Sequence, residues 1–387
     1  MNPVAVGLTL APAVAFGYAY VGYPALLRVL AAAQPPLRPL PDPLEWPSIT
    51  VTVPAFNAEH SIRQVLDNLL AADYPAERRQ ILVISDASVD GTDDAVRDYA
   101  GRGVELLRMP ERRGKTAAES AAGRVARGRI VVNIDATVRI LPHSLKALVR
   151  AFGDSTVGVA SGCDRSVGAG QEENGAEASY VGYEMWLREL ETRLGGIVGA
   201  SGCFYAFRRD VHDLDLPEEL SRDFASALIA RERGYRSVTV PEAVCVVPRA
   251  RTLEAEYERK IRTMARGLET LWYKRALMNP FRYGTFAFML ASHKLCRWLV
   301  SLLIPVAAVG LLMVGAGSAG GAIVFALSVA LVLAGMMGMR WPRNRTAPRL
   351  FSLAGYVVAS NVAGVMAWTR AVRGRSTPLW EPTRRPG

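Results

Sequence analysis

The chain has 387 residues, a hydrophobic fraction of 50%, a formal net charge of +10 and a mean hydropathy of +0.13. This length allows one large domain or two ordinary ones, and the apolar content is high for a purely water-soluble protein. The positive charge does not indicate a nucleic-acid partner, because much of the arginine surplus flanks apolar segments. Anionic lipid headgroups are the simpler partner there.

Residues 1–33 are predicted to form a transmembrane helix that is not cleaved. The segment has no charged side chain before Arg28, and its apolar run is longer than the apolar region of a signal peptide. It also lacks a basic start and a clear small-residue cleavage site. A Pro-rich linker over residues 34–47, stiff and extended, separates this helix from the body of the chain.

Apolar runs return near the C-terminus, over residues 298–369. Trp298–Met339 has no charged side chain and is long enough for two spans of about 20 residues, broken at the Gly-rich turn Gly315–Gly321. Leu350–Trp368 is open to two interpretations, a third span or an interfacial or re-entrant helix. A basic tail covers residues 370–387. The positive-inside rule places the loop between the runs in the cytoplasm, because it carries Arg340, Arg343, Arg345 and Arg349.

The cysteines show neither a disulfide framework nor zinc-ligand spacing. They are scattered along the chain as Cys163, Cys203, Cys245 and Cys296. We expect buried thiols in a reducing compartment.

Strand and helix signals alternate from residue 48 onward. The predicted strands are Ile49–Val53, Ile81–Ser85, Val104–Met109 and Ile130–Asp135, and the predicted helices are Ser61–Ala72, Thr92–Tyr99 and Thr116–Ala126. Such alternation predicts an α/β fold with a largely parallel sheet, whose binding residues lie at the C-terminal ends of the strands.

Polar and acidic residues collect at those strand ends. Pro54–Glu59 (PAFNAE) follows the first strand, Ser85–Thr92 (SDASVDGT) closes the second, and Asp135 ends the fourth. Each could be a helix cap when taken singly. Their recurrence at successive strand ends favours a binding site.

The same segments resemble the motifs of one enzyme family, in the same order. PAFNAE is similar to PAYNEE, SDASVDGT to SDGSTDGT, RRGKTAA to RxGKxxA, and VNIDAT to the strand that bears DxD. Further on, SYVGYE, GASGCFYAFRR and RDFASALIARERGYR resemble the acceptor-side helix, the Gly-rich substrate loop and the ED segment. The chain is identified as a member of the membrane-bound, inverting family-two glycosyltransferases, which resemble cellulose, chitin and hyaluronan synthases.

This resemblance implies an α/β fold of the GT-A (nucleotide-diphospho-sugar transferase) type with N- and C-terminal transmembrane helices. The catalytic domain would cover residues 48–250, and amphipathic interfacial helices would cover residues 251–297. The implied donor-binding residues are Pro54, Asn57, Glu59, Asp86, Asp90, Lys115, Asp135 and Arg262.

Three of these residues have chemistry that suits a nucleotide-sugar. By resemblance, Asp86 would lie near the nucleobase. Asp90 suits the ribose, and capping a helix is an equally good explanation of it. Lys115 follows Gly114 at a predicted helix start, where it would meet the base edge or a phosphate.

Asp135 is the family's metal-binding candidate. An Mg²⁺ or Mn²⁺ ion bridging the diphosphate would neutralise charge on the leaving group, and the protein need supply only one or two oxygens. The second acidic position of the family is Thr137 in this chain. Asp135 and Thr137 are therefore the expected metal ligands. With threonine in place of a second carboxylate, we expect the affinity for the metal ion to be reduced.

Asp223 is the candidate catalytic base. Inversion needs a base on the face opposite the leaving diphosphate, and the ED resemblance implies Asp223 at the start of a helix predicted over Phe224–Gly234. Capping this helix is the alternative role. Arg222 replaces the family's first acidic residue, and a neighbouring cation would lower the pKa of the Asp223 carboxyl group.

The QxxRW motif of processive relatives is altered. Arg259, Arg262 and Thr263 stand at the Gln, Arg and Trp positions of that motif. Arg262, with Arg266, keeps a positive charge for the diphosphate. The aromatic side chain that supports the glycan in processive relatives is missing. A basic interfacial helix lying on lipid headgroups is the alternative interpretation, and both can hold.

On the acceptor side, the resemblance implies a helix and a Gly-rich loop. The helix would present Tyr183, Glu184 and Glu191, and the loop Ser201 and Gly202. We expect His293, near the membrane entry, to be a satisfied interfacial side chain rather than a catalytic group.

The sequence thus predicts a multi-pass glycosyltransferase of the inner membrane with a cytoplasmic catalytic domain. It would move one or a few sugars from a nucleotide-sugar, a UDP-sugar by family habit, to a lipid-linked or polysaccharide acceptor. The rival is a catalytically degenerate nucleotide-binding subunit of a polysaccharide assembly complex, suggested by Thr137, Arg222, the altered QxxRW and Ser120. A transporter does not fit, because three or four spans around a body of about 240 residues leave little membrane volume for a pathway.

Overall fold

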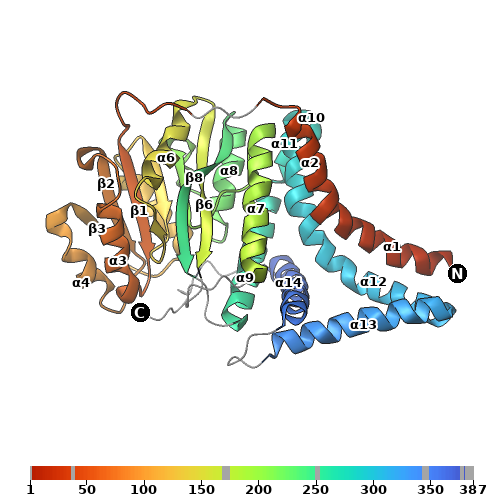
Figure 1. The fold of residues 1–387 in the computed structure, drawn as a ribbon. Helices are drawn as coiled ribbons and strands as arrows, with labels where there is room; N and C mark the ends of the chain where they lie inside the picture. The colour runs from red at the N-terminus through yellow and green to blue at the C-terminus, as the bar shows by residue number, and fades with distance from the viewer. Residues whose placement is uncertain are drawn as a thin grey trace.

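The structure of the chain is a computed structural model that describes residues 2–35, 40–167, 175–248, 253–341, 348–374 and 379. Parts of the predicted linker, of the basic loop with Arg343 and Arg345, and of the basic tail lie outside the described residues. The described residues form a mixed α/β body with long apolar helices on one side of it (Figure 1).

An eight-stranded sheet has the order β3-β2-β1-β4-β7-β6-β8-β5. The strands are β1 Ile49–Ala55, β2 Arg79–Ser85, β3 Val104–Arg108, β4 Ile130–Ile134, β5 Arg139–Ile140, β6 Val157–Val167, β7 Phe204–Arg208 and β8 Arg236–Pro248. β1 pairs in parallel with both β2 and β4, and β2 with β3. β7 is antiparallel to β4 and β6, while β8 is parallel to β6 and antiparallel to β5.

The expected parallel pairing is therefore confirmed for β1, β2, β3 and β4, whereas the second half of the sheet is mixed, with β6 parallel to β8 and β7 antiparallel to both of its neighbours. The strands that were predicted are the four parallel ones. β7 follows a long excursion through β6 and α7, so the chain can return beside β4 in the opposite direction. A parallel sheet puts the C-terminal ends of β1, β2 and β4 at one edge, where the polar motifs begin.

Helices of the body connect these strands. They are α3 Glu59–Leu70, α4 Thr92–Arg97, α5 Lys115–Val125, α6 Ser144–Arg150, α7 Gly175–Leu194 and α8 Arg222–Glu232. The elements predicted over residues 48–135 are confirmed, with ends that differ by one or two residues. α8 begins at Arg222 with Ser221 in the cap position, so Asp223 lies in the first turn rather than before the helix.

The core is built from the buried central strands and the apolar faces of the helices that cover them. All residues of β1 and β4 are buried, as expected for strands covered on both faces. One large cluster joins β1, β2 and β4 to α3 and α6, and Val51, Val53, Ile62 and Leu66 are fully buried in it. This core fixes the strand ends, and hence the motifs that follow them.

The remaining helices lie toward the two ends of the chain. They are α1 Pro3–Gly17, α2 Tyr23–Ala32, α9 Leu253–Tyr273, α10 Pro280–Tyr283, α11 Thr285–Leu290, α12 Arg297–Gly317, α13 Ala319–Met339 and α14 Arg349–Val372. A π-helical turn, Tyr18–Gly22, joins α1 to α2, and another, Ala291–Cys296, joins α11 to α12. Figure 1 shows α7 standing between the sheet and these helices, with α1, α12 and α13 extending away from the body on the same side.

Four helical segments are long and apolar enough to cross a membrane, namely Pro3–Ala32, Thr285–Gly317, Ala319–Met339 and Arg349–Val372. The predicted break between the two central apolar runs is confirmed, because α12 ends at Gly317 and α13 begins at Ala319. The helical run that leads into α12 already begins at Thr285. Part of the region expected to be interfacial thus continues without interruption into a long apolar helix.

Candidate active site

The loops after β1 and β2 hold each other in place. The Asn57 side-chain oxygen accepts the backbone N–H of Val89 at 2.9 Å, and Asn57 adopts a positive φ of 48°. Asp90 accepts the backbone N–H groups of Thr92 at 3.0 Å and of Glu59 at 3.2 Å, and the Glu59 carboxylate accepts Gly91 N–H at 3.1 Å. In the structure Asp90 therefore ties the two loops together, and the cap position of α4 is held by Gly91.

Asp86 organises the next motif. Its carboxylate oxygens accept the backbone N–H groups of Arg113 and Gly114, each at 2.8 Å, and the residue is 1% exposed. Asp86 thus holds the RRGK loop against the end of β2. Pro54 lies within β1 opposite Ile84, so it contributes to the sheet edge beneath these loops.

Lys115 stands at the first position of α5 and bridges two motifs. Its ammonium group donates to Asp135 Oδ1 at 2.5 Å and to the carbonyl oxygen of Gly202 at 2.7 Å. Burial alone would lower the pKa of Lys115, but the carboxylates of Asp135 and Glu119 raise it above its ordinary value. Lys115 is therefore a permanent cation at the end of β4.

Asp223 lies on the other side of the same loop. A Cβ atom at Gly202 would stand 2.8 Å from Asp223 Oδ2, and the Ser221 hydroxyl donates to Asp223 Oδ1 at 2.5 Å. Lys115, Asp135, Gly202 and Asp223 therefore form one group of neighbours, which we call the central cluster. The metal candidate and the base candidate, 88 positions apart in the sequence, are joined by Lys115 and the backbone of Gly202.

Arg222 does not point at the base candidate. Its guanidinium group lies 3.7 Å from the Glu119 carboxylate, donates to the Ser120 hydroxyl, and donates to the Asp213 carbonyl oxygen at 2.7 Å. Arg222 is 3% and Glu119 is 2% exposed. Burial raises the pKa of Glu119 to about 7, against the lowering influence of Lys115 and Arg222. The two unusual residues at positions 222 and 120 are thus direct partners.

The fit to a divalent metal rests on few protein oxygens. Asp135 supplies one carboxylate, of which Oδ1 also receives the Lys115 ammonium, and Thr137 supplies a hydroxyl two residues later. Among the described residues, no group of three or more His, Cys, Asp or Glu side chains could hold a metal ion. This donor set fits Mg²⁺ or Mn²⁺ only together with diphosphate oxygens, which are hard ligands of the same kind.

The arginines of α9 lie against the same region. Arg266 donates to the carbonyl oxygens of Leu220 at 2.6 Å and Glu219 at 3.0 Å, and to the Thr116 hydroxyl at 2.8 Å. It thereby ties α9 to the start of α5 and to the segment before α8. Arg262 lies one helical turn earlier on α9.

The Gly-rich loop is held by two serines and an aspartate. The buried Ser201 donates its N–H to Ser161 Oγ at 2.8 Å and its hydroxyl to Asp164 Oδ1 at 2.6 Å. At the start of this loop, a Cβ atom at Gly199 would approach the Phe224 ring to 3.1 Å. The loop therefore needs glycine at both ends, since each packs against the first turn of α8.

Tyr183 and Glu184 face the terminal helices rather than the central cluster. The Tyr183 hydroxyl donates to the Tyr20 carbonyl oxygen at 2.9 Å and accepts from Arg297 at 2.9 Å. The Glu184 carboxylate is bound by Arg297 and lies 3.2 Å from His293 Nε2.

Glu191 extends this network two turns along α7. Its Oε1 accepts from the Tyr23 hydroxyl at 2.8 Å and lies 2.6 Å from His293 Nδ1, while its Oε2 is buried without a partner among the described residues. His293 is 2% exposed and engaged by both glutamates, which agrees with its expected role as a satisfied side chain. Burial would raise the pKa of Glu184 and Glu191, but His293 and the neighbouring cations hold both below their ordinary range.

The comparisons with known proteins agree with this arrangement. The family model of glycosyl transferase family 2 matches residues 50–214, which contain the loops after β1, β2 and β4 and the Gly-rich loop. Residues 50–214 therefore form a family-two glycosyltransferase domain.

Its sequence relatives carry enzyme names of the same class. An N-acetylglucosaminyltransferase of Rhizobium sp. is 26% identical over 223 residues, which cover 52% of this chain and 48% of the relative. A dodecaprenyl-phosphate galacturonate synthase of Rhizobium johnstonii is 32% identical over 119 residues, covering 30% of this chain and 35% of the relative. The matched region of the glycosyltransferase thus spans about half the length or less of these relatives.

A solved structure matches nearly the whole glycosyltransferase chain. A mannosyltransferase from Pyrobaculum calidifontis, in complex with GDP-Man and Mn²⁺, is similar with a TM-score of 0.73 and 26% sequence identity. The match covers 96% of this chain and 99% of that chain. The GT-A fold and the apolar helices are therefore parts of one shared architecture.

Several residues of this glycosyltransferase escaped the sequence analysis. Asp164, Glu119, Arg188 and Lys294 lie outside the quoted family motifs or in positions without an assigned role, so no local signal singled them out. Asp164 and Arg188 meet the Gly-rich loop through Ser201 and Ser161, and Lys294 lies beside Gly199, whereas Glu119 of α5 lies beside Lys115 and Arg222.

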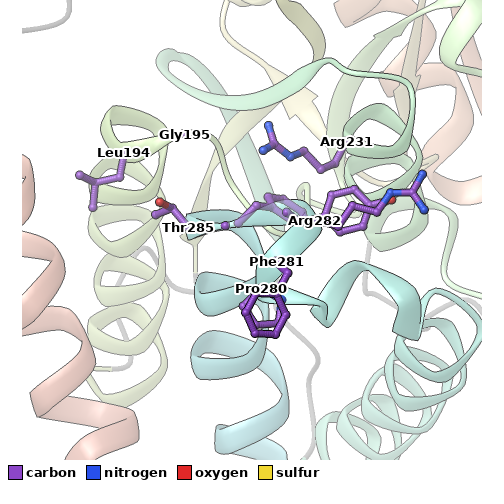
Figure 2. Close-up of a pocket in the computed structure, with 10 residues that line it drawn as sticks. Leu194, Gly195, Arg231, Pro280, Phe281, Arg282 and Thr285 are labelled. Atoms are coloured by element: carbon purple, nitrogen blue, oxygen red, sulfur yellow. The ribbon is translucent and has the colours of Figure 1, made fainter.

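A separate pocket of about 410 Å³ lies where α7 and α8 end against α10 and α11. Figure 2 shows Leu194, Arg231, Phe281 and Arg282 at its wall. Arg231 lies eight residues along α8 from Asp223, which is about 12 Å at the rise of a helix. This pocket is therefore distinct from the central cluster.

Proposed function

We propose that the glycosyltransferase moves a sugar, with inversion, from a nucleotide-sugar to a lipid-linked acceptor at the inner membrane. The observation that carries the proposal is the central cluster, in which Lys115 donates to both Asp135 and the Gly202 carbonyl oxygen while Gly202 abuts Asp223. This arrangement brings a place for diphosphate charge and a carboxylate base to the two sides of one loop.

Asp223 would act as the base. As the acceptor oxygen bonds to the anomeric carbon and the bond to the diphosphate breaks, Asp223 Oδ2 takes the acceptor proton. The Ser221 hydroxyl at 2.5 Å from Oδ1 orients the carboxylate, and the absence of a side chain at Gly202 leaves Oδ2 accessible from the loop.

Lys115 and Asp135 would receive the donor diphosphate. Lys115 adds a fixed positive charge beside the leaving group, and Arg262 of α9 adds a second cation in the proposed donor site. When bound, Mg²⁺ or Mn²⁺ would neutralise charge on the leaving diphosphate, with Asp135 and Thr137 as its protein ligands. In this proposal Asn57, Glu59, Asp86 and Asp90 shape the nucleoside side by fixing the strand-end loops, with Pro54 beneath them.

The names of the relatives agree on sugar transfer as the class of reaction, and they differ in the sugar that is transferred. Two are named for prenyl-phosphate substrates, the dodecaprenyl-phosphate galacturonate synthase and an undecaprenyl-phosphate 4-deoxy-4-formamido-L-arabinose transferase of Aeromonas hydrophila. Other relatives are named N-acetylglucosaminyltransferases, and the mannosyltransferase holds GDP-Man. A UDP-sugar is our proposed donor, and the altered QxxRW motif supports transfer of one or a few sugars.

Multi-pass insertion with the body in the cytoplasm is also part of the proposal. Three of the four long apolar segments extend from one side of the body in Figure 1, and the arginines at the ends of the α13–α14 connection suit the cytoplasmic face. α14 packs beside α13 and α9, and crossing and interfacial placements of α14 both suit that packing.

The test is release of nucleotide from a panel of UDP-, GDP- and dTDP-sugars by the detergent-purified chain with Mg²⁺ or Mn²⁺. We expect one donor to be hydrolysed, and Asp135→Asn and Asp223→Asn each to lower the rate at least about 100-fold. Ser226→Ala, on the same helix as Asp223, serves as the control and should stay active.

The same experiment separates the rival function. Tight nucleotide binding without turnover of any donor would support a degenerate nucleotide-binding subunit. Turnover that survives both substitutions would refute the roles assigned to Asp135 and Asp223.

A further inference from the structure

Two cations on the acceptor side have no ionic partner among the described residues. Arg188 of α7 makes a single long contact, from Nη1 to Ser161 Oγ at 3.4 Å, and its Nε is buried without a hydrogen bond. Lys294, in the second π-helical turn, has its ammonium group 5.9 Å from the centroid of the Phe224 ring and forms no hydrogen bond or ion pair among the described residues. Within the described part of the chain, no carboxylate comes within 4.0 Å of either group.

Both cations lie on the Gly-rich loop. Ser161, the contact of Arg188, also accepts the N–H of Ser201, and Lys294 Cε lies 3.6 Å from where a Cβ atom at Gly199 would stand. Gly199 and Gly202 are three positions apart, so the loop spans at most about 11 Å between the contact of Lys294 and the central cluster.

The carboxylates nearest to Lys294 are already engaged by other partners. The carboxylates that attract Lys294 are Glu184 and Glu191, and both are already bound by His293 or Arg297. Arg188 is close enough to Lys294 to repel it. Two like charges held close together in a partly buried place, neither of them in direct contact with a carboxylate of the described residues, favour the binding of an anion.

We propose that Lys294 and Arg188 bind the phosphate of a lipid acceptor and so hold its reacting group at the Gly-rich loop. This inference rests on the proposed function and names the acceptor's charged group within it. Lys294 belongs to the helical run Thr285–Gly317, which is long and apolar enough to cross a membrane. A phosphate bound there sits where a lipid headgroup leaves the bilayer, which favours a lipid over a free phosphate.

The π-helical turn explains how the chain presents this lysine. The wider turn at Ala291–Cys296 directs His293 and Arg297 to the glutamates of α7 and leaves Lys294 over Phe224 and Gly199. Such turns are frequent at functional sites.

The test measures binding without turnover. Farnesyl phosphate and farnesol are titrated into the full chain in maltoside micelles, and binding is followed by microscale thermophoresis. The wild-type chain should bind farnesyl phosphate at least about tenfold more tightly than farnesol. Lys294→Met and Arg188→Met should each remove about a tenfold share of that preference, because each deletes a charged donor, and farnesol affinity should stay unchanged.

Two matched variants guard against indirect effects. Lys294→Arg should keep the preference, since it keeps the charge. Arg282→Met, at the pocket of Figure 2, should leave it unchanged. Loss of the preference in Arg282→Met, or its survival in both Lys294→Met and Arg188→Met, would overturn the proposal, and so would equal binding of the two probes by the wild-type chain.

A separate measurement keeps the two proposals apart. UDP binding should be unaltered in Lys294→Met. If no nucleotide-sugar is turned over while phosphate binding behaves as expected, the transferase proposal fails and this site stands. If transfer occurs but Lys294→Met leaves the acceptor KM unchanged, the site fails and the transferase proposal stands.

Discussion

At the scale of single residues, the contact between Arg222 and Ser120 weakens the case for a catalytically degenerate subunit. Each departs from the family pattern, and taken separately each suggested a degenerate site. The guanidinium group of Arg222, the first residue of α8, donates to Ser120 and lies 3.7 Å from Glu119, both on α5. One internal contact accounts for both departures, so they no longer count as two independent losses near the base.

This contact makes a prediction about stability. Arg222→Met should destabilise the chain by about 3 kcal/mol, because it removes one of the two cations, Arg222 and Lys115, that lie beside the buried Glu119 carboxylate. Arg222→Met combined with Glu119→Gln should lose less than the sum of the two single changes. Thermal unfolding of the purified chain measures both.

Arg97→Met provides the comparison. Arg97 pairs with Asp94 on the surface, with both side chains more than half exposed, so the change should stay within about 0.5 kcal/mol. Additive effects of the Arg222 and Glu119 substitutions would contradict the coupling.

At the scale of elements, the Gly-rich loop and the first turn of α8 form one unit. Gly202→Ala would place a methyl group 2.8 Å from Asp223 Oδ2, so the carboxylate must move. A displacement of about 1 Å in a reacting group can cost about 100-fold in rate. We expect kcat to fall by about that factor while the thermal midpoint changes little.

Gly182→Ala is the matched control, because nothing lies within 4 Å of the added Cβ on α7. Its activity should equal that of the wild-type chain, and alanine is the better helix former. An equal loss of kcat in both variants would show that the Asp223 contact is not the cause.

At the level of elements, strands and helices could be predicted where residues adjacent in the sequence determine them. The strands ending at Ser85 and Ile134 could be predicted because β-branched runs and turn residues lie side by side in the chain. The partners of Lys115 could not be predicted, since Gly202 reaches it only through the antiparallel placement of β7 beside β4. Tyr183 and Glu184 were expected on the correct helix, but their helical face is set by packing against α2 and α12.

At the scale of the whole molecule, small residues join the apolar helices. A Cβ atom at Gly338 of α13 would stand 2.0 Å from the Phe351 carbonyl oxygen of α14, and one at Gly310 of α12 would stand 2.7 Å from the backbone of Leu8 in α1. Such close backbone approach is typical of helix pairs in membranes. Sequence hydropathy could locate these helices, whereas their pairing depends on glycines that are unremarkable in the sequence.

Gly338→Ala should therefore separate α13 from α14. We expect a loss of about 1–3 kcal/mol, as for other overpacked contacts, seen as a lower thermal midpoint in detergent. Gly320→Ala lies on the same helix with nothing within 4 Å of the added atom and should be neutral. A neutral Gly338→Ala would show that the two helices do not pack this closely.

The two π-helical turns connect the N-terminal apolar segment to the rest of the molecule. The turn at Tyr18–Gly22 offers the Tyr20 carbonyl oxygen to Tyr183, the Tyr18 hydroxyl meets Ser292 at 2.7 Å, and Tyr23 reaches Glu191. The end of the first apolar segment is thus bonded to α7 and to the second π-helical turn, so this segment is not a tether that can be cut away. A fragment that starts at the sheet would keep the loops after β1, β2 and β4 and lose the partners of Tyr183, Glu191 and Ser292.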